Sequence, residues 1–195
     1  GNDTLKGGVL IDGGEGDDSI DVDEDDVLSS TIMSGVGNDT IDAEDVSFSF
    51  IESGEGDDEI DTSTVLSSTI ISGVGNDTID TEDVSFSFIE SGEGDDSIDI
   101  DDSPLLNSTV TSGIGNDTFY IYSPTSSFID GGDGDDSIEF ADDDDVVSSS
   151  IIGGAGNDTL YSGYNLSFSL IESGEGDDQI DTSTVLNSTI TSGIG

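Results

Sequence analysis

Several kinds of residue are missing from this sequence of 195 residues, which has no cysteine, no histidine, no tryptophan and one basic residue, Lys6. Without cysteine the chain forms neither a disulfide nor a thiolate metal site, and its redox compartment cannot be inferred. Without histidine it lacks the commonest general base and the commonest zinc ligand. No apolar run approaches membrane-spanning length, so membrane insertion is not expected.

The balance of charge is extreme, because 47 acidic residues against one basic residue give a net charge of −46. This charge repels nucleic acids and anionic membranes, which excludes both as direct partners. It also opposes compaction, so either the chain is disordered or cations neutralise it. The apolar residues are periodic and the acids recur at fixed offsets from glycines. We therefore expect an ordered cation-bound form and a largely unfolded metal-free chain.

One short motif recurs along the whole chain. Two glycines one residue apart are followed by Asp or Asn, then by Asp, one polar residue and one apolar residue, as in residues 54–60. Nine full copies begin at Gly14, Gly35, Gly54, Gly73, Gly92, Gly113, Gly132, Gly154 and Gly174, at steps of 19 to 22 residues, and partial copies stand at both ends. This period predicts a repeat architecture in which each copy forms one coil.

Each coil is predicted to contain a glycine turn, a short strand, a second turn and a second strand. In the coil that begins at Gly54, Ile60 should face inward, residues 62–64 should turn, and the β-branched run 65–71 should return as a strand. Variation in coil length is expected in the second turn, since insertions in solenoids collect on one loop face. Acidic and apolar residues alternate between the two glycines of successive copies. Coils of twice this length with two metal-binding edges are therefore the second-ranked alternative.

The motif is suited to a hard metal ion. Glycines at alternate positions allow positive φ and close backbone approach, so carbonyl oxygens can point into the turn. The second acid can reach back into the turn, and stacking places the next turn about 4.8 Å away. The gap between two coils then contains carboxylate and carbonyl oxygens but no nitrogen or sulfur ligand, which favours calcium over magnesium.

The motif resembles the repeats-in-toxin (RTX), or hemolysin-type, calcium-binding nonapeptide Gly-Gly-x-Gly-x-Asp-x-U-x, where U is apolar. Residues 13–21 and 131–139 match every defined position, whereas most other copies have serine in place of the first glycine: Ser34, Ser53, Ser72, Ser91, Ser112 and Ser173. The resemblance implies a parallel β-roll with calcium held between stacked turns.

The resemblance assigns the metal to the Asp at the sixth position of each copy and to the turn glycines. The aspartates are Asp18, Asp39, Asp58, Asp77, Asp96, Asp117, Asp136, Asp158 and Asp178, with Asp3 in the first partial copy. The glycines are Gly14, Gly16, Gly35, Gly37, Gly54, Gly56, Gly73, Gly75, Gly92, Gly94, Gly113, Gly115, Gly132, Gly134, Gly154, Gly156, Gly174 and Gly176.

Compared with the common two-edged roll, the chain more closely resembles a one-edged variant with a repeat of roughly nineteen residues, because only one turn in each coil carries the motif. That variant occurs in long repeat regions of bacterial surface adhesins, and one such region binds ice through an exposed Thr-x-Asn row. Here the Thr position holds apolar residues in some coils and acids in the others: Val36, Val74, Ile114 and Ala155, and Glu15, Glu55, Glu93, Asp133 and Glu175. A flat, uncharged ice-binding row is therefore not expected.

The aromatic residues leave an alternative open. Phe86 and Phe88 recur in alternate coils as Phe48 and Phe50, and again as Phe168 and Leu170. Since Phe88 adjoins Ile89, a regular strand turns only one of them inward. The phenylalanines are therefore either an exposed stripe that contacts a neighbouring roll or, with a bulge, part of the core.

Other features favour ordinary structural roles. The acidic runs 23–26 and 142–145 are interpreted as solvated loops. Four tyrosines in successive coils are interpreted as a packing patch: Tyr120, Tyr122, Tyr161 and Tyr164. Paired carboxylates such as Glu55 and Asp57 repeat in every second coil and imply no cleft, so a glycosidase site is not expected. No nucleophile and base stand together, and we do not expect an enzyme.

We therefore predict one all-β domain over residues 1–195, a right-handed parallel β-roll or β-helix of about ten coils. One turn per coil should bind metal, with about one calcium ion for each adjacent pair of coils. The chain is expected to be a segment of a longer secreted bacterial surface protein, such as an adhesin, sheath or surface-layer filament, that stiffens on extracellular calcium. Self-association through the phenylalanine stripe or the uncapped ends is expected, and a face that binds ice or a glycan is the alternative function.

Overall fold

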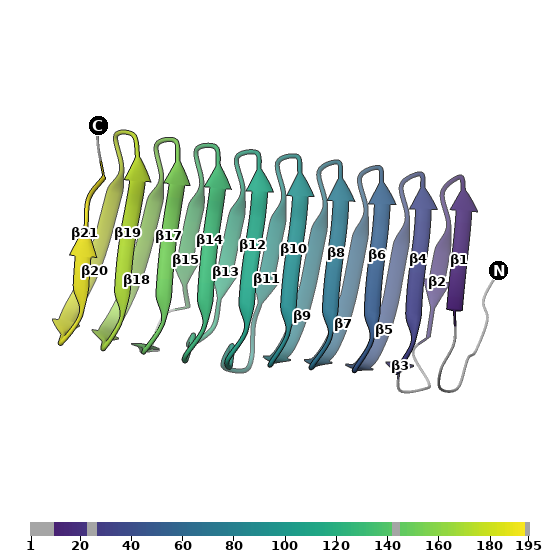
Figure 1. The fold of residues 1–195 in the computed structure, drawn as a ribbon, viewed down its shortest axis with the longest axis horizontal. Coiled ribbons are helices and arrows are strands. Elements are labelled where there is room, and N and C mark those ends of the chain that lie inside the picture. The colour runs from purple at the N-terminus through teal and green to yellow at the C-terminus, as the bar shows by residue number, and fades with distance from the viewer. Residues whose placement is uncertain (1–9, 23–26, 142–144, 194–195) are drawn as a thin grey trace.

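The chain winds into a solenoid whose coils stack side by side along one axis (Figure 1). The computed structural model describes residues 10–22, 27–141 and 145–193, which form strands and turns. No helix in these ranges is long and apolar enough to cross a membrane. Successive coils add strands to a ten-stranded and an eleven-stranded parallel sheet, here called sheet A and sheet B. The predicted all-β solenoid of about ten coils is confirmed.

Sheet A contains the strand that leads into each glycine turn. Neighbouring strands are parallel and in register, so that Gly73, Gly92 and Gly113 lie side by side. The strands in spatial order are β1 (Leu10–Glu15), β4 (Thr31–Val36), β6 (Phe50–Glu55), β8 (Thr69–Val74), β10 (Phe88–Glu93), β12 (Thr109–Ile114), β14 (Phe128–Asp133), β17 (Ser150–Ala155), β19 (Leu170–Glu175) and β21 (Thr189–Thr191).

Sheet B contains the strand that follows each glycine turn. Its strands in chain order are β2 (Ser19–Asp21), β3 (Val27–Leu28), β5 (Thr40–Ser47), β7 (Glu59–Leu66), β9 (Thr78–Ser85), β11 (Ser97–Ile100), β13 (Thr118–Ile121), β15 (Ser137–Phe140), β16 (Val146–Val147), β18 (Thr159–Ser167) and β20 (Gln179–Leu186). The two sheets face each other, and the glycine turns join them at the upper edge in Figure 1.

The second turn lies later in the coil than the sequence predicted. Strand β7 continues through residues 62–64, and Thr62 is buried beside Thr81 of β9. The chain turns instead at Ser67, which has a φ of +50°, and at Ser68, whose Oγ donates to the Leu66 carbonyl at 2.9 Å. The predicted turn at 62–64 is wrong because the Thr62 side chain packs inward in step with Ile60, which continues the strand.

In the coil that begins at Gly92, the extra residues interrupt sheet B and do not lengthen the second turn. After Ile100 strand β11 ends, and pairing resumes with a single bridge between Leu106 and Ser85. The acidic run 23–26 and residues 142–144 lie outside the described residues, between β2 and β3 and between β15 and β16. Insertions therefore collect at one place in the coil, as predicted, but that place is inside a sheet.

The core is a column of branched aliphatic side chains between the two sheets. Sheet A supplies residues such as Ile51, Ile70 and Ile89, and sheet B supplies Ile60 and Ile79, all with no exposed surface. Each such side chain stabilises the fold by about 1.5–3 kcal/mol through burial. The inward orientation predicted for Ile60 is confirmed. Since each coil buries its side chains against the next, the core is continuous along the array.

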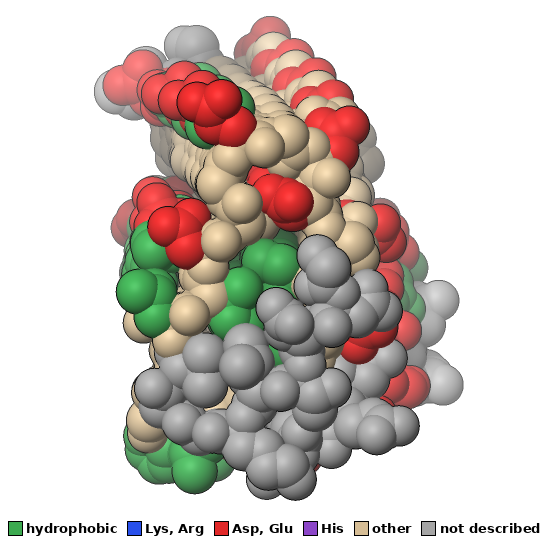
Figure 2. Space-filling view, turned by 90° about the vertical axis from the view of Figure 1, so that its right-hand side faces the viewer, with side chains coloured by type: hydrophobic (Ala, Val, Ile, Leu, Met, Phe, Trp, Pro, Cys, Tyr) green, Lys and Arg blue, Asp and Glu red, His purple; other side chains and the backbone are tan. Residues whose placement is uncertain are grey.

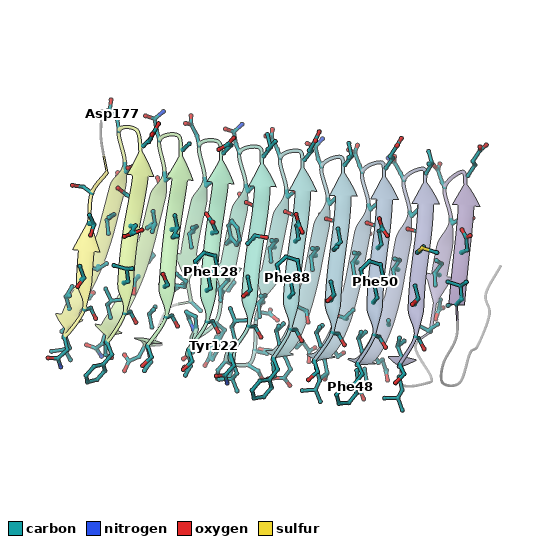
Figure 3. The ribbon with its side chains drawn as sticks, in the orientation of Figure 1. Phe48, Phe50, Phe88, Tyr122, Phe128 and Asp177 are labelled. Atoms are coloured by element: carbon teal, nitrogen blue, oxygen red, sulfur yellow. The ribbon has the colours of Figure 1, made fainter. Side chains whose placement is uncertain are left out.

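The phenylalanines of the candidate stripe face outward, whereas Phe119 and Phe140 are buried in the core. Ile89 is buried, so Phe88 lies half-buried on the outer face of sheet A, in line with Phe50 and Phe128 (Figure 3). Phe48 is 61% exposed at the second turn, the lower edge in Figure 3, with a φ of +52°. Phe86 and Phe168 have the same conformation and similar exposure. These residues therefore form an outward-facing stripe and are not part of the core.

Candidate metal-binding edge

The glycine turns need glycine for two separate reasons. Gly54 and Gly56 have φ values of +116° and +138°, in the region that other residues avoid. A Cβ atom on Gly54 would lie 2.0 Å from the Gly35 carbonyl oxygen of the preceding coil, and one on Gly56 would lie 1.9 Å from the Gly37 oxygen. All 18 paired glycines of the nine turns have positive φ. The turns can therefore stack at strand spacing only because these side chains are missing.

The predicted metal-ligating aspartates form one row inside this edge, which we call the inner aspartate row. Asp58 Oδ1 accepts a hydrogen bond from the Asp39 main-chain N–H at 2.8 Å, and Asp77 Oδ1 accepts one from Asp58 N–H at 2.8 Å. The same bond links each neighbouring pair along the row, whose members are Asp18, Asp39, Asp58, Asp77, Asp96, Asp117, Asp136, Asp158 and Asp178. Asp3 lies outside the described residues.

The second carboxylate oxygen of these side chains has no hydrogen-bond donor. Oδ2 is buried and unpartnered in Asp18, Asp39, Asp58, Asp77, Asp96, Asp117, Asp136 and Asp158. Buried polar oxygens are nearly always satisfied, since an unpaired one costs about 1–3 kcal/mol. A regular row of them along one edge indicates that a cation belongs there.

Burial also shifts the acidity of the row. Desolvation raises the pKa of Asp77 from its ordinary value of 3.8 to about 6, although the Asp58 main-chain N–H and the nearby Ser72 hydroxyl act to lower it. Desolvation raises the pKa of Asp136 to about 7, and neighbouring carboxylates add to the effect. The pKa values of Asp58, Asp96, Asp117 and Asp158 are raised mainly by the same cause. Without cations, burial therefore makes each of these side chains easier to protonate than an ordinary aspartate.

The donor set fits calcium. The edge offers carboxylate and carbonyl oxygens, which suit a hard cation that tolerates irregular geometry. No group of three acidic side chains converges in the described ranges. A gap between coils therefore presents the row's aspartates from its two flanking coils, and main-chain oxygens would complete the shell. The inner aspartate row would hold the ion, and the paired glycines would bring the backbone close enough to share it.

A second polar row lies outside the first and was not predicted. Asn76 donates to Asp57 Oδ1 through its main-chain N–H at 2.8 Å, and Asn76 Oδ1 accepts from Asp95 N–H at 2.8 Å. The row alternates Asp and Asn along the whole edge: Asp17, Asn38, Asp57, Asn76, Asp95, Asn116, Asp135, Asn157 and Asp177. Asp177 marks its position in Figure 3. The alternation was visible in the sequence, but its hydrogen-bonding role was not.

The serines that replace the first motif glycine also bond between coils, which the sequence did not reveal. Ser53 Oγ donates to the Ser72 main-chain oxygen at 2.9 Å, and Ser72 Oγ donates to the Ser91 oxygen at 2.8 Å. Both serines are completely buried beside the inner aspartate row. In the view from the N-terminal end, acidic side chains line the edge that carries the glycine turns (Figure 2).

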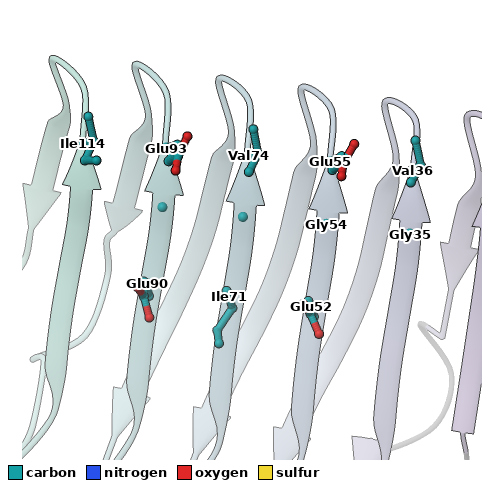
Figure 4. Close-up of a pocket in the computed structure, with 12 residues that line it drawn as sticks. Gly35, Val36, Glu52, Gly54, Glu55, Ile71, Val74, Glu90, Glu93 and Ile114 are labelled. Carbon is teal, nitrogen blue, oxygen red and sulfur yellow. The ribbon is translucent and has the colours of Figure 1, made fainter.

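The outer face of sheet A carries a shallow groove of about 640 Å³ over the glycine row (Figure 4). Its walls alternate acidic and apolar residues along the axis, with Glu52 and Glu55 on one coil and Ile71 and Val74 on the next. Val36, Val74 and Ile114 are about half exposed but are separated by acidic residues. This arrangement agrees with the expectation that a uniform, uncharged row is not present.

The fold and this edge define a parallel β-solenoid of stacked acidic turns, in the class of metal-binding repeat proteins. Residues 126–147 and 149–163 match the family model of the RTX calcium-binding nonapeptide repeat. The chain thus contains RTX calcium-binding repeats over these residues, and the other copies of the motif repeat their pattern and register. The matched family is a binding repeat and not an enzyme family.

A solved structure has the same fold. The chain is similar to a hyperactive, Ca²⁺-dependent, β-helical antifreeze protein from an Antarctic bacterium, with a TM-score of 0.71 and 22% sequence identity. The similarity covers 97% of this chain and 73% of the antifreeze protein. At this identity the similarity shows the fold alone. A comparison with curated proteins gave no significant match.

Proposed function

We propose that residues 1–195 form one calcium-stiffened structural array within a secreted bacterial surface protein, such as an adhesin or a surface filament. The row of buried, unpartnered Oδ2 atoms supports this most directly, because each of these atoms needs a cation in the folded state. The net charge of −46 supports it as well, since the compact chain needs neutralisation along its length.

Calcium binding and folding are one process in this proposal. In a cytoplasm with little free calcium the charged chain remains unfolded and suitable for export. Outside the cell, calcium at the level that extracellular modules use neutralises the inner aspartate row and lets the coils stack. Within each turn, the main-chain bond to Oδ1 orients the carboxylate, and Oδ2 is left for the ion. Because each coil contacts only its neighbours, stiffness extends along the array.

Circular dichroism during a calcium titration tests the folding mechanism. We expect strand signal to be weak in chelator and to develop cooperatively with calcium. An Asp77→Asn variant keeps the Oδ1 acceptor but loses the charge, so its transition should need more calcium. The matched control is Asp61→Asn, on the exposed face of sheet B, which should change the transition little. Full strand signal in chelator, or indifference to calcium, would contradict the mechanism.

We also propose lateral self-association through the outward phenylalanines. Phe86 is 62% exposed at the second turn, and Phe88 lies nearby on sheet A. A Phe86→Ser/Phe88→Ser variant should fold with calcium, because Ser67 and Ser126 already adopt the same positive φ at this turn. Sedimentation in calcium should show association of the parent chain and its loss in the variant. Equal association of both proteins would exclude the stripe as the interface.

Binding of ice or a glycan is the alternative function. The similar fold of the antifreeze protein is its only support, and fold does not carry function. Acidic side chains interrupt the exposed apolar positions in every second coil. The structural role is therefore the better supported proposal.

A further inference from the structure

The first residue of each motif copy divides the boundaries between coils into two kinds. In the serine-type boundaries its Oγ donates to the main-chain oxygen of the equivalent residue in the next coil. Five consecutive boundaries are of this type, with the donors Ser34, Ser53, Ser72, Ser91 and Ser112 and the last acceptor Gly131. In the glycine-type boundaries the first residue is Gly13, Gly131 or Gly153, which has no hydroxyl to donate.

At a glycine-type boundary, two unlike oxygens converge where a side chain would be. A Cβ atom built on Gly131 would lie 2.4 Å from the Gly153 carbonyl oxygen and 2.6 Å from Asp136 Oδ2. One built on Gly153 would lie 2.3 Å from the Ser173 carbonyl oxygen and 2.6 Å from Asp158 Oδ2. A side-chain carbon does not fit at these distances, so the two oxygens can approach this position only because the residue is glycine. Both are oxygen donors of the kind that calcium binds.

The carboxylates at these points are unpartnered as well as buried. Asp136 is 2% exposed and Asp158 is 1% exposed, and neither Oδ2 has a hydrogen-bond donor. Gly13 has the same surroundings, with the Ser34 carbonyl oxygen at 2.5 Å and Asp18 Oδ2 at 2.8 Å from its Cβ position. Each glycine-type boundary thus presents a carbonyl oxygen of one coil and a carboxylate oxygen of the other to the same space.

At a serine-type boundary the serine side chain changes both the open space and the carbonyl oxygen that faces it. The serine Cβ and Oγ fill the space that glycine leaves open. The hydroxyl proton bonds the carbonyl oxygen of the next coil, as in the 2.9 Å bond from Ser53 to Ser72. That oxygen then has a partner without a metal ion, and an approaching cation must compete with the hydroxyl for it. Only the carboxylate oxygen remains unpartnered, as in Asp58.

We propose that the chain has two classes of calcium site, tight at the glycine-type boundaries and weaker at the serine-type boundaries. The serine hydroxyls hold the central coils together in place of strong metal bonds, and the glycine boundaries depend on calcium. This rests on the proposed calcium-binding function and adds that the bound ions fall into two sets of unequal affinity.

Calorimetric calcium titration of the full chain tests the two classes. We expect two phases whose affinities differ by about tenfold, which corresponds to about 1.4 kcal/mol. The tight phase should match the number of glycine-type boundaries. Ser72→Gly opens a space beside Asp77 and should add one tight ion, whereas Gly153→Ser should remove one. Ser72→Ala is the matched control, because its Cβ still fills the space, and it should add none.

Circular dichroism in saturating calcium establishes that each variant folds, and Ser91→Gly replaces Ser72→Gly if the latter does not. A single phase that the substitutions leave unchanged would overturn the two classes. Loss of a tight ion in Ser72→Gly would also overturn them, since it would make the serine a ligand. If the chain still binds calcium in either of these outcomes, the proposed function is not contradicted. That function fails separately if the parent chain binds no calcium or folds equally well in chelator.

Discussion

At the scale of single residues, the turn selects its amino acids through backbone contact more than through side-chain chemistry. Gly75 has a φ of +139°, and a Cβ there would lie 1.9 Å from the Gly56 carbonyl oxygen. The preceding residue, Val74, is 48% exposed, and its position alternates between apolar and acidic residues in successive coils. Two neighbouring residues of one turn therefore differ in whether they tolerate substitution.

A Gly75→Ala substitution should destabilise the calcium-bound fold by about 1–3 kcal/mol from backbone strain alone. The contact with the preceding coil should add to this, because the Cβ meets backbone and not a flexible side chain. Thermal unfolding in saturating calcium measures the effect. Val74→Ala in the same turn is the control and should stay within about 0.5 kcal/mol of the parent. Equal stability of the two variants would refute the stacking argument.

At the scale of elements, the two edges of a coil obey different rules. The glycine turn keeps one length in all nine copies, because the inner and outer polar rows bond to both neighbouring coils. Sheet B accepts extra residues between its two ladder segments, as at residues 101–104. How well each place tolerates inserted or deleted residues follows from the number of hydrogen bonds that it makes to other coils.

Deletion of Asp101 and Asp102 should therefore be tolerated, since it shortens that coil to the length of its neighbours and removes the positive φ of Asp102. We expect the calcium midpoint and the melting temperature to change little. Insertion of one glycine between Gly94 and Asp95 should raise the calcium concentration at the midpoint and lower the melting temperature. The reason is that it displaces the hydrogen bonds of Asp95 and Asp96 to adjacent coils. The idea is wrong if the insertion and the deletion have equal effects on thermal unfolding.

The sequence predicted the elements that depend on strict spacing. The period placed the nine aspartates in one row, and the inward position of Ile60 was predicted, whereas strand alternation left open which of Phe88 and Ile89 is buried. It failed at Thr62, because a threonine in a polar segment resembles a turn residue until its inward side is known. The roles of Asn76 and Ser53 could not be predicted, since each bonds to a residue one coil away whose register the sequence does not state.

At the scale of the whole molecule, the alternation of coils separates like charges. On the turn row of sheet A, Glu55 and Glu93 are divided by Val74, so neighbouring carboxylates stand about 9.6 Å apart instead of about 4.8 Å. That separation is close to the screening length of about 8–10 Å at ordinary salt. Sheet B has no such alternation, and Asp61 and Asp80 lie directly side by side. Burial, and then the Asp61 charge, raises the pKa of Asp80.

The raised pKa values predict that acid partly replaces calcium. The folded form holds protons on Asp77 up to about pH 6 and on Asp136 up to about pH 7, whereas the unfolded chain releases them near 3.8. Stability of the metal-free fold should therefore rise as the pH falls through this window and be lost as it rises.

Circular dichroism in chelator should show strand signal that grows from about pH 8 to about pH 5. The calcium midpoint should move to higher calcium over the same range, because protons compete for the same carboxylates. An Asp136→Asn variant should show a smaller pH effect. Strand signal that does not change with pH in chelator would contradict the assigned burial of the row.

The interruption of sheet B at residues 101–104 has a mechanical consequence. Strands β7 and β9 pair through seven residues, but β9 and β11 pair through four. A pull along the solenoid axis loads the coil boundaries in series, so every boundary carries the same tension. The array is then as strong as its weakly paired boundaries, and rupture under force should begin at one of these, such as the boundary between β9 and β11, while the uniform coils between Gly35 and Gly92 remain closed.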